Sequence, residues 1–127
     1  MDILKEGGIN SLPTNWDEVI EACNVMKSNG IKNPIFWGWN ITGNWFMQAM
    51  LWSQDKAIVD GNTINLDSKE ATLALETMNR IFLECEMQNL SWKEALASFA
   101  AGEIGMMYWS TSALGTVERT KGDFALK

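Results

Sequence analysis

The chain has 127 residues, of which 46% are apolar and 20% charged, and it carries a formal net charge of -6. This length and balance suit a single domain with a buried core, spanning residues 1–127. The ten basic residues are scattered between Lys5 and Lys127 without a run. Charge and its distribution therefore exclude a nucleic-acid partner, because such binding depends on clustered Lys and Arg.

Histidine is absent, which excludes Ser-His and Cys-His triads, the usual zinc sites and the commonest general base. We find no nucleophile–base pair, no metal-ligand spacing and no cofactor motif. A sugar hydrolase would need two carboxylates across a cleft, and no such pair can be identified. We therefore expect a protein without enzymatic activity, metal or cofactor.

Cys23 and Cys85 are the only cysteines, and each lies among apolar neighbours in a predicted helix. We expect them to behave as small buried hydrophobes. A disulfide between them is the alternative, although their spacing alone does not support it.

The first predicted elements are a helix and a strand. Thr14 with Asp17 forms a capping pair that opens a helix over 15–29, and Gly30 can close it in a left-handed turn. An apolar strand, "PIFWG", follows at 34–38.

The middle of the chain predicts a helix and then a hairpin. A helical pattern fits 43–54. The triplet Asp60-Gly61-Asn62 is typical of a tight turn, here between extended pieces near 56–59 and 63–66.

A long amphipathic helix is predicted over 68–87, opened by Asp67 with Glu70. Apolar residues recur in it at helical spacing. The predicted buried face comprises Ala71, Ala74, Leu75, Met78, Ile81, Phe82 and Cys85.

The last part of the chain predicts a helix over 92–101, opened by Ser91 with Glu94 and closed by Gly102. The strand "EIGMMYW" follows at 103–109. Two less regular elements complete the pattern, a helix over 111–120 and a strand over 123–127. Strands separated by helices indicate an α/β fold, with helices packed on a small sheet. No apolar run is long enough to span a membrane, and "MDILKEGG" lacks the features of a secretory signal.

Two segments carry a family resemblance, "MDILKEGGINSLPTNWDEVIEACNVMKSNGIKNPIFWGWN" and "EALASFAAGEIGMMYWSTSALGTVERTKGDFALK". The first contains Pro-x-x-Trp-Asp-Glu from Pro13 to Glu18. The second places Phe99 and Gly102-Glu103 before a strand with two methionines. In order and spacing these blocks resemble extracellular solute-binding proteins of ABC importers, in the group that handles sugars and oligosaccharides. The similarity covers essentially the whole chain.

The resemblance implies a partial lobe of the periplasmic-binding-protein type. Such proteins are longer, with two α/β lobes joined by hinge strands around a ligand cleft, and this chain resembles the central part of the second lobe. Because the chain ends inside the predicted strand at 123–127, we expect further chain beyond Lys127.

The resemblance also places two loops at the cleft, after the strand at 34–38 and after that at 103–109. An indole stacks on the apolar face of a pyranose, while amide and hydroxyl groups bind its hydroxyls. By this match Trp45 is the stacking residue. Trp39 and Trp109 are flanking walls, and Asn40 and Ser110 bind hydroxyls.

Each tryptophan also has a purely structural interpretation. We expect core positions for Trp37 and Trp52, and ordinary packing at helix starts for Trp16 and Trp92. For Trp39, Trp45 and Trp109 the core and ligand-facing interpretations both stay open.

The expected partners are a sugar or oligosaccharide and, in a full-length relative, a membrane permease. The alternative is a free-standing remnant, beginning at its own Met1, that associates as a homodimer or segment-swapped dimer through exposed sheet edges. The family works in the periplasm or outside the cell. Without a signal in this sequence, a free-standing product would be cytoplasmic.

Overall fold

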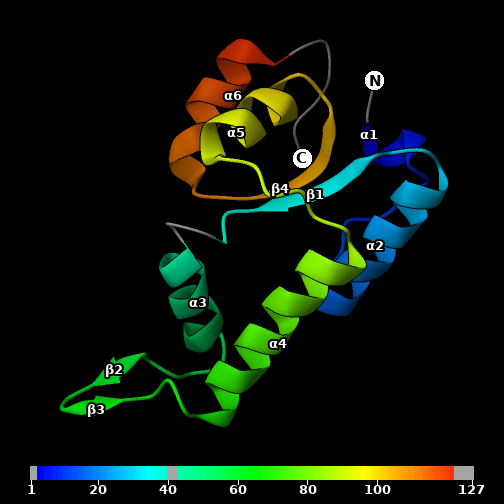
Figure 1. The fold of residues 1–127 in the computed structure, drawn as a ribbon. Helices are drawn as coiled ribbons and strands as arrows, with labels where there is room; N and C mark the ends of the chain where they lie inside the picture. Colours follow the sequence, from blue (N-terminus) through cyan, green and yellow to red (C-terminus); the bar gives the residue numbers. More distant parts are fainter. Residues whose placement is uncertain (1–2, 40–42, 122–127) are drawn as a thin grey trace. The chain divides into compact units, whose positions relative to one another are not determined.

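The structure, a computed structural model, describes residues 3–39 and 43–121 (Figure 1). The chain forms two compact units. One comprises residues 1–37 and 81–127 and is called the sheet unit; the other, residues 38–80, is called the hairpin unit. The boundary between Arg80 and Ile81 falls inside one helix, α4 (Lys69–Glu84). Each unit is described by itself.

The sheet unit is built on two parallel strands, β1 (Asn33–Trp37) and β4 (Ile104–Tyr108), with Trp37 opposite Tyr108. Helix α2 packs on β1, and α5 packs on β4 and on α6 (Figure 1). The helices of this unit are α1 (Ile3–Glu6), α2 (Trp16–Ser28), α5 (Trp92–Ala100), the 3₁₀ turn η1 (Thr111–Ala113), α6 (Leu114–Thr120) and the C-terminal end of α4. The predicted α/β class and both strands are confirmed, while the predicted strand at 123–127 lies outside the described residues.

Helix α2 begins one residue later than the sequence predicts. The cap is Asn15, whose side chain accepts a hydrogen bond from the backbone N–H of Glu18 at 2.9 Å. The Glu18 carboxylate in turn accepts from the backbone N–H and hydroxyl of Thr14. The predicted capping pair of Thr14 with Asp17 was wrong. Asn15 and Glu18 have the same three-residue spacing, one residue later in the sequence, and form the cap instead. Gly30 follows the helix at φ +89°, in the predicted left-handed turn.

The core of the sheet unit lies between α2 and the strands. Phe36 and Trp37 of β1 are buried, as is Met26 of α2. A Cβ at Gly105 of β4 would lie 2.7 Å from the Met26 sulfur and 2.9 Å from the Pro34 carbonyl oxygen. The Pro34 carbonyl is backbone and could move away only with its strand, whereas the Met26 thioether is the end of a flexible side chain; glycine therefore lets β4 lie this close to β1 and Met26.

Helix α5 begins as predicted. The Ser91 hydroxyl accepts from the backbone N–H of Glu94 at 3.3 Å, and the Glu94 carboxylate accepts from the backbone N–H of Ser91 at 2.8 Å. Gly102 follows at φ +77° and leads into β4.

The hairpin unit contains α3 (Gly43–Trp52), a short antiparallel pair β2 (Val59–Asp60) and β3 (Thr63–Ile64), and the first part of α4. Gly61 turns the hairpin at φ +57°. Asn65 is buried and donates to the Ala57 carbonyl at 2.8 Å, which anchors the base of the hairpin. Its buried residues include Phe46, Met47, Met50 and Leu51 of α3 and Ala71, Ala74 and Thr77 of α4.

Helix α4 corrects the sequence prediction at both ends and on its face. The Ser68 hydroxyl, not Asp67, caps it by accepting from the backbone N–H of Ala71 at 3.1 Å. It ends at Glu84, before Glu86 at φ +52°, rather than at 87. The predicted face is buried at Ala71, Ala74, Ile81 and Cys85. Leu75 is exposed, because it lies ~100° around the helix from Ala74 and outside this stripe.

Candidate functional site

The two parallel strands of the sheet unit end opposite each other, at Trp37 and Tyr108. Ligand sites of open α/β folds lie beyond the carboxyl ends of their strands. From these ends the chain continues as Gly38–Trp39 and as Trp109–Ser110. Four of the five predicted site residues are described, and three of those four follow directly from these strand ends.

Within the sheet unit, the strand ends carry a packed aromatic cluster of Trp16, Trp37 and Tyr108. Trp16 stacks on Trp37, with ring centroids 5.0 Å apart and planes at 21°. Tyr108 lies 5.3 Å from Trp16 and 4.8 Å from Trp37. Trp37 is 1% exposed, which confirms its predicted place in the core and the packing role of Trp16. Burial raises the pKa of Tyr108, so its phenol is neutral at physiological pH.

Trp109 is half-buried in the same unit. Its ring centroid lies 6.2 Å from that of Phe36 and 6.4 Å from that of Trp92, whose plane is nearly parallel at 13°. It packs against the small core cluster of Phe36, Ala95 and Ile104. Part of the Trp109 ring is therefore committed to packing.

Ser110 is exposed and caps η1. Its hydroxyl oxygen accepts from the backbone N–H of Ser112 at 3.3 Å and from the Ser112 hydroxyl at 3.0 Å. The Ser110 hydroxyl can still donate its own proton, because both of these bonds use it as the acceptor.

Trp39 and Trp45 belong to the hairpin unit, and both are exposed, by 41% and 64%. Trp45 lies in the first turn of α3. Asn40, the predicted hydroxyl-binding residue between them, lies outside the described residues. The predicted site thus divides into two groups: Trp39 and Trp45 in one unit, Trp109 and Ser110 in the other.

Trp52 was predicted to be core, and that was wrong, since it is 58% exposed. It lies two turns after Trp45 on the same face of α3, opposite the face that buries Phe46, Met47 and Leu51. The two indoles are about 10 Å apart along the helix axis. The seven-residue spacing, set against the buried positions, was the signal that could have identified this face.

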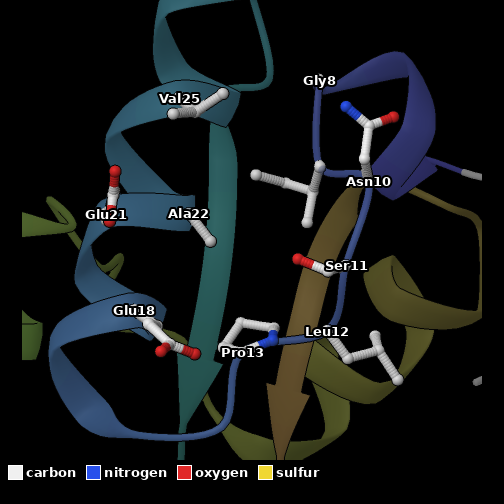
Figure 2. A pocket seen from close by; sticks show the side chains of 10 residues that line it. Gly8, Asn10, Ser11, Leu12, Pro13, Glu18, Glu21, Ala22 and Val25 are labelled. Atoms are coloured by element: carbon white, nitrogen blue, oxygen red, sulfur yellow. The ribbon is translucent and has the colours of Figure 1, made fainter.

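A separate hollow of about 290 Å³ lies between α2 and the segment 8–13 (Figure 2). The Glu18 carboxylate lies beside Pro13 there, and Asn10 and Ser11 supply polar groups on the opposite side. Hydrogen bonds from the Thr14 backbone and hydroxyl, with a further one from Asn15, lower the pKa of Glu18. These bonds use the Glu18 carboxylate to cap α2.

Within residues 3–39 and 43–121, no group of three or more Cys, Asp or Glu side chains is placed to hold a metal ion. In the same part of the chain, none of the helices has the length and apolar character needed to cross a membrane.

Comparison with known proteins gives one family match. The model of the family described as "Bacterial extracellular solute-binding protein" matches residues 1–125. A search of the solved structures finds no significant match.

Proposed function

The chain belongs to the family of bacterial extracellular solute-binding proteins, which serve ABC importers, and we propose that it binds a sugar or oligosaccharide and catalyses no reaction. Members of this family in general bind solutes and are not enzymes. The carbohydrate as ligand, and the absence of catalysis in this chain, are parts of the proposal.

The observation that carries the proposal is the exposed indole surface of the hairpin unit. Trp39 and Trp45 leave 41% and 64% of their surface accessible, and Trp39 follows the last residue of β1 by two positions in the chain. Exposed aromatic faces of this size are costly to hydrate, and they can stack on the C–H face of a pyranose. In this arrangement Trp45 is the stacking residue and Trp39 flanks it.

Asn40, Trp109 and Ser110 complete the proposed set. Asn40 and Ser110 would bind sugar hydroxyls, Ser110 through the proton that its capping role leaves available. Trp109 would offer the part of its ring that Phe36 and Trp92 do not cover.

The surface is proposed as one wall of a cleft whose opposite wall belongs to a second lobe. Capture would follow closure of the two lobes by hinge motion, and the closed form would dock on a membrane permease. Small-ligand sites bury about 70–90% of the ligand surface. A single wall should therefore bind weakly, and the site of action would be outside the cytoplasmic membrane.

The test is a titration of the purified chain with a panel of oligosaccharides, followed by tryptophan fluorescence. We expect a saturable change with at least one sugar, lost in Trp45→Ala. Trp52→Ala is the matched control, because Trp52 lies on the same helix face with similar exposure. Loss in both variants would extend the stacking surface along α3. A saturable response that survives Trp45→Ala would refute the assigned stacking role, and no response to any sugar would refute the ligand class.

One observation favours a second candidate, a self-associating interaction domain. Besides its tryptophans, the hairpin unit also exposes the apolar side chains of Val59, Ile64, Leu66, Leu73 and Leu75. Exposed apolar side chains in such number favour association. Light scattering separates the candidates. A stable dimer indifferent to every sugar would replace the transport function, whereas a sugar-responsive monomer would exclude self-association.

A further inference from the structure

Two thiols meet inside the sheet unit. Cys23 lies in α2 and Cys85 directly follows α4, 62 positions later in the sequence, and both are completely buried as free cysteines. Their side chains are joined by a hydrogen bond. The chain leaves for the hairpin unit and returns from it between these two residues.

Neighbouring contacts hold the two segments together independently of the thiols. Lys27 lies one turn after Cys23 on the same face of α2. Its ammonium group donates to the backbone carbonyl of Glu84 at 2.8 Å and pairs with the Glu86 carboxylate at 2.8 Å. These bonds bracket Cys85 in the sequence, so α2 is fixed against the segment that carries the second thiol.

We propose that Cys23 and Cys85 form a site for an intramolecular disulfide that joins α2 to the end of α4. The proposal does not depend on sugar binding. In the structure both cysteines are reduced, and their contact allows a disulfide to form between them.

The reaction partner is a small-molecule disulfide such as oxidised glutathione. One protein thiolate attacks a sulfur of that disulfide and releases a glutathione thiolate, which leaves a mixed disulfide on the protein. The second protein thiolate attacks the protein sulfur of this mixed disulfide and releases the second glutathione thiolate. The two protons lost by the cysteines end on the two glutathione thiols, so two electrons pass from the protein to the oxidant.

The two buried thiols interact with each other and with Lys27. Their shared hydrogen bond lowers the pKa of Cys85 and, together with burial, raises the pKa of Cys23. The Lys27 ammonium favours the thiolate of either cysteine, so either one can be the first nucleophile. Because both sulfurs are buried, exchange occurs during folding or local opening, and the folded contact then determines the equilibrium.

An oxidising environment would favour this disulfide. The family name places these proteins outside the cell, where disulfides form and persist. The bond would close a loop that contains the whole hairpin unit, so it would fix the base from which that unit leaves the sheet unit.

The test measures the disulfide equilibrium of the whole chain in glutathione buffers of graded ratio, once in native buffer and once in urea. Thiol alkylation and mass spectrometry count the reduced, mixed and intramolecular species. Cys23→Ala and Cys85→Ala are the controls, since each can form only a mixed disulfide with glutathione.

We expect the equilibrium constant for the intramolecular bond to be on the order of 100-fold higher in native buffer than in urea. By linkage, the oxidised chain should then unfold at a higher urea concentration than the reduced chain. Equal constants in the two solvents, or a lower one in native buffer, would overturn the proposal. A chain that fails to fold would give equal constants and count against it as well.

Discussion

The tryptophans of the two units have different environments. Each of the four in the sheet unit lies next to another aromatic ring: Trp16 with Trp37, and Trp92 with Trp109. The three in the hairpin unit are all exposed, by 41% at Trp39, 64% at Trp45 and 58% at Trp52. Every tryptophan of the sheet unit thus contacts another ring, although Trp92 is itself 45% exposed, whereas exposure is the common feature of the three in the hairpin unit.

The difference follows from how much structure each unit can place around a ring. In the sheet unit, helices pack on both strands, so a ring at a strand end meets neighbours on several sides. The hairpin unit has α3, a two-stranded hairpin and part of α4, and small units bury a smaller share of their surface. Its buried residues include Ala, Met and Leu together with Phe46, and its three indoles are exposed.

The largest effect that tests this contrast is the removal of one indole from each unit. Trp37→Ala should lower the free energy of unfolding by about 3–5 kcal/mol, because it leaves a cavity beside Trp16 and Tyr108. Trp45→Ala should change it by less than about 0.5 kcal/mol, because the ring is already exposed. Urea unfolding followed by circular dichroism measures both.

Similar losses in the two variants would remove the contrast between the units. In that case the Trp45 ring would have a packing role that its exposure conceals. A large loss only at Trp37 would leave Trp45 available for a ligand without cost to the fold.

A smaller effect tests how tightly the sheet unit is packed. Gly105→Ala should destabilise by about 1–3 kcal/mol, because the new methyl group meets the Pro34 carbonyl and the Met26 sulfur. Gly115→Ala in α6 is the matched control, where the nearest atom is the Arg119 guanidinium at 3.5 Å. That control should stabilise by up to about 1 kcal/mol through helix propensity. Equal tolerance of both changes would mean that α2 can move away from β4.

Much of the fold was predictable from local sequence signals. The box of Ser91 with Glu94 and the glycines at 30 and 102 mark helix ends through backbone chemistry that the structure repeats. The errors at α2 and α4 came from competing caps one residue apart, where the sequence offers two side chains for one backbone donor. Local signals settle which elements form, and less often which adjacent residue begins them.

The candidate site was less predictable, because exposure depends on tertiary neighbours. Trp37 could be assigned to the core from its place in an apolar strand. The seven-residue spacing could place Trp52 on one face of α3 with Trp45, but which face of that helix is buried depends on its tertiary neighbours. The roles of Trp39, Trp45, Trp109 and Ser110 stay predictions, because the fold establishes their environments and not their ligand.

The smallest predicted effect concerns glutamates with a lowered pKa in the first turn of a helix, which both units contain. Hydrogen bonds from the Ser91 hydroxyl and backbone lower the pKa of Glu94 in the sheet unit. In the hairpin unit, a hydrogen bond from its own backbone N–H lowers the pKa of Glu70. A carboxylate with a lowered pKa stabilises the fold above its ordinary value of 4.5, and this contribution disappears as the pH falls through the lowered value.

Ser91→Ala should therefore cost about 1 kcal/mol near pH 7, by removing the cap of α5. Glu94→Gln keeps a side chain that can accept the same bond but does not titrate. The difference in unfolding free energy between the wild type and Glu94→Gln should shrink as the pH falls below 4.5, and Glu70→Gln should behave alike. Urea unfolding at a series of pH values measures this. If the difference in unfolding free energy between the wild type and either variant did not change with pH, the carboxylate charge would not stabilise that helix start. If only Glu70→Gln failed, the looser packing of the hairpin unit would extend to its helix caps.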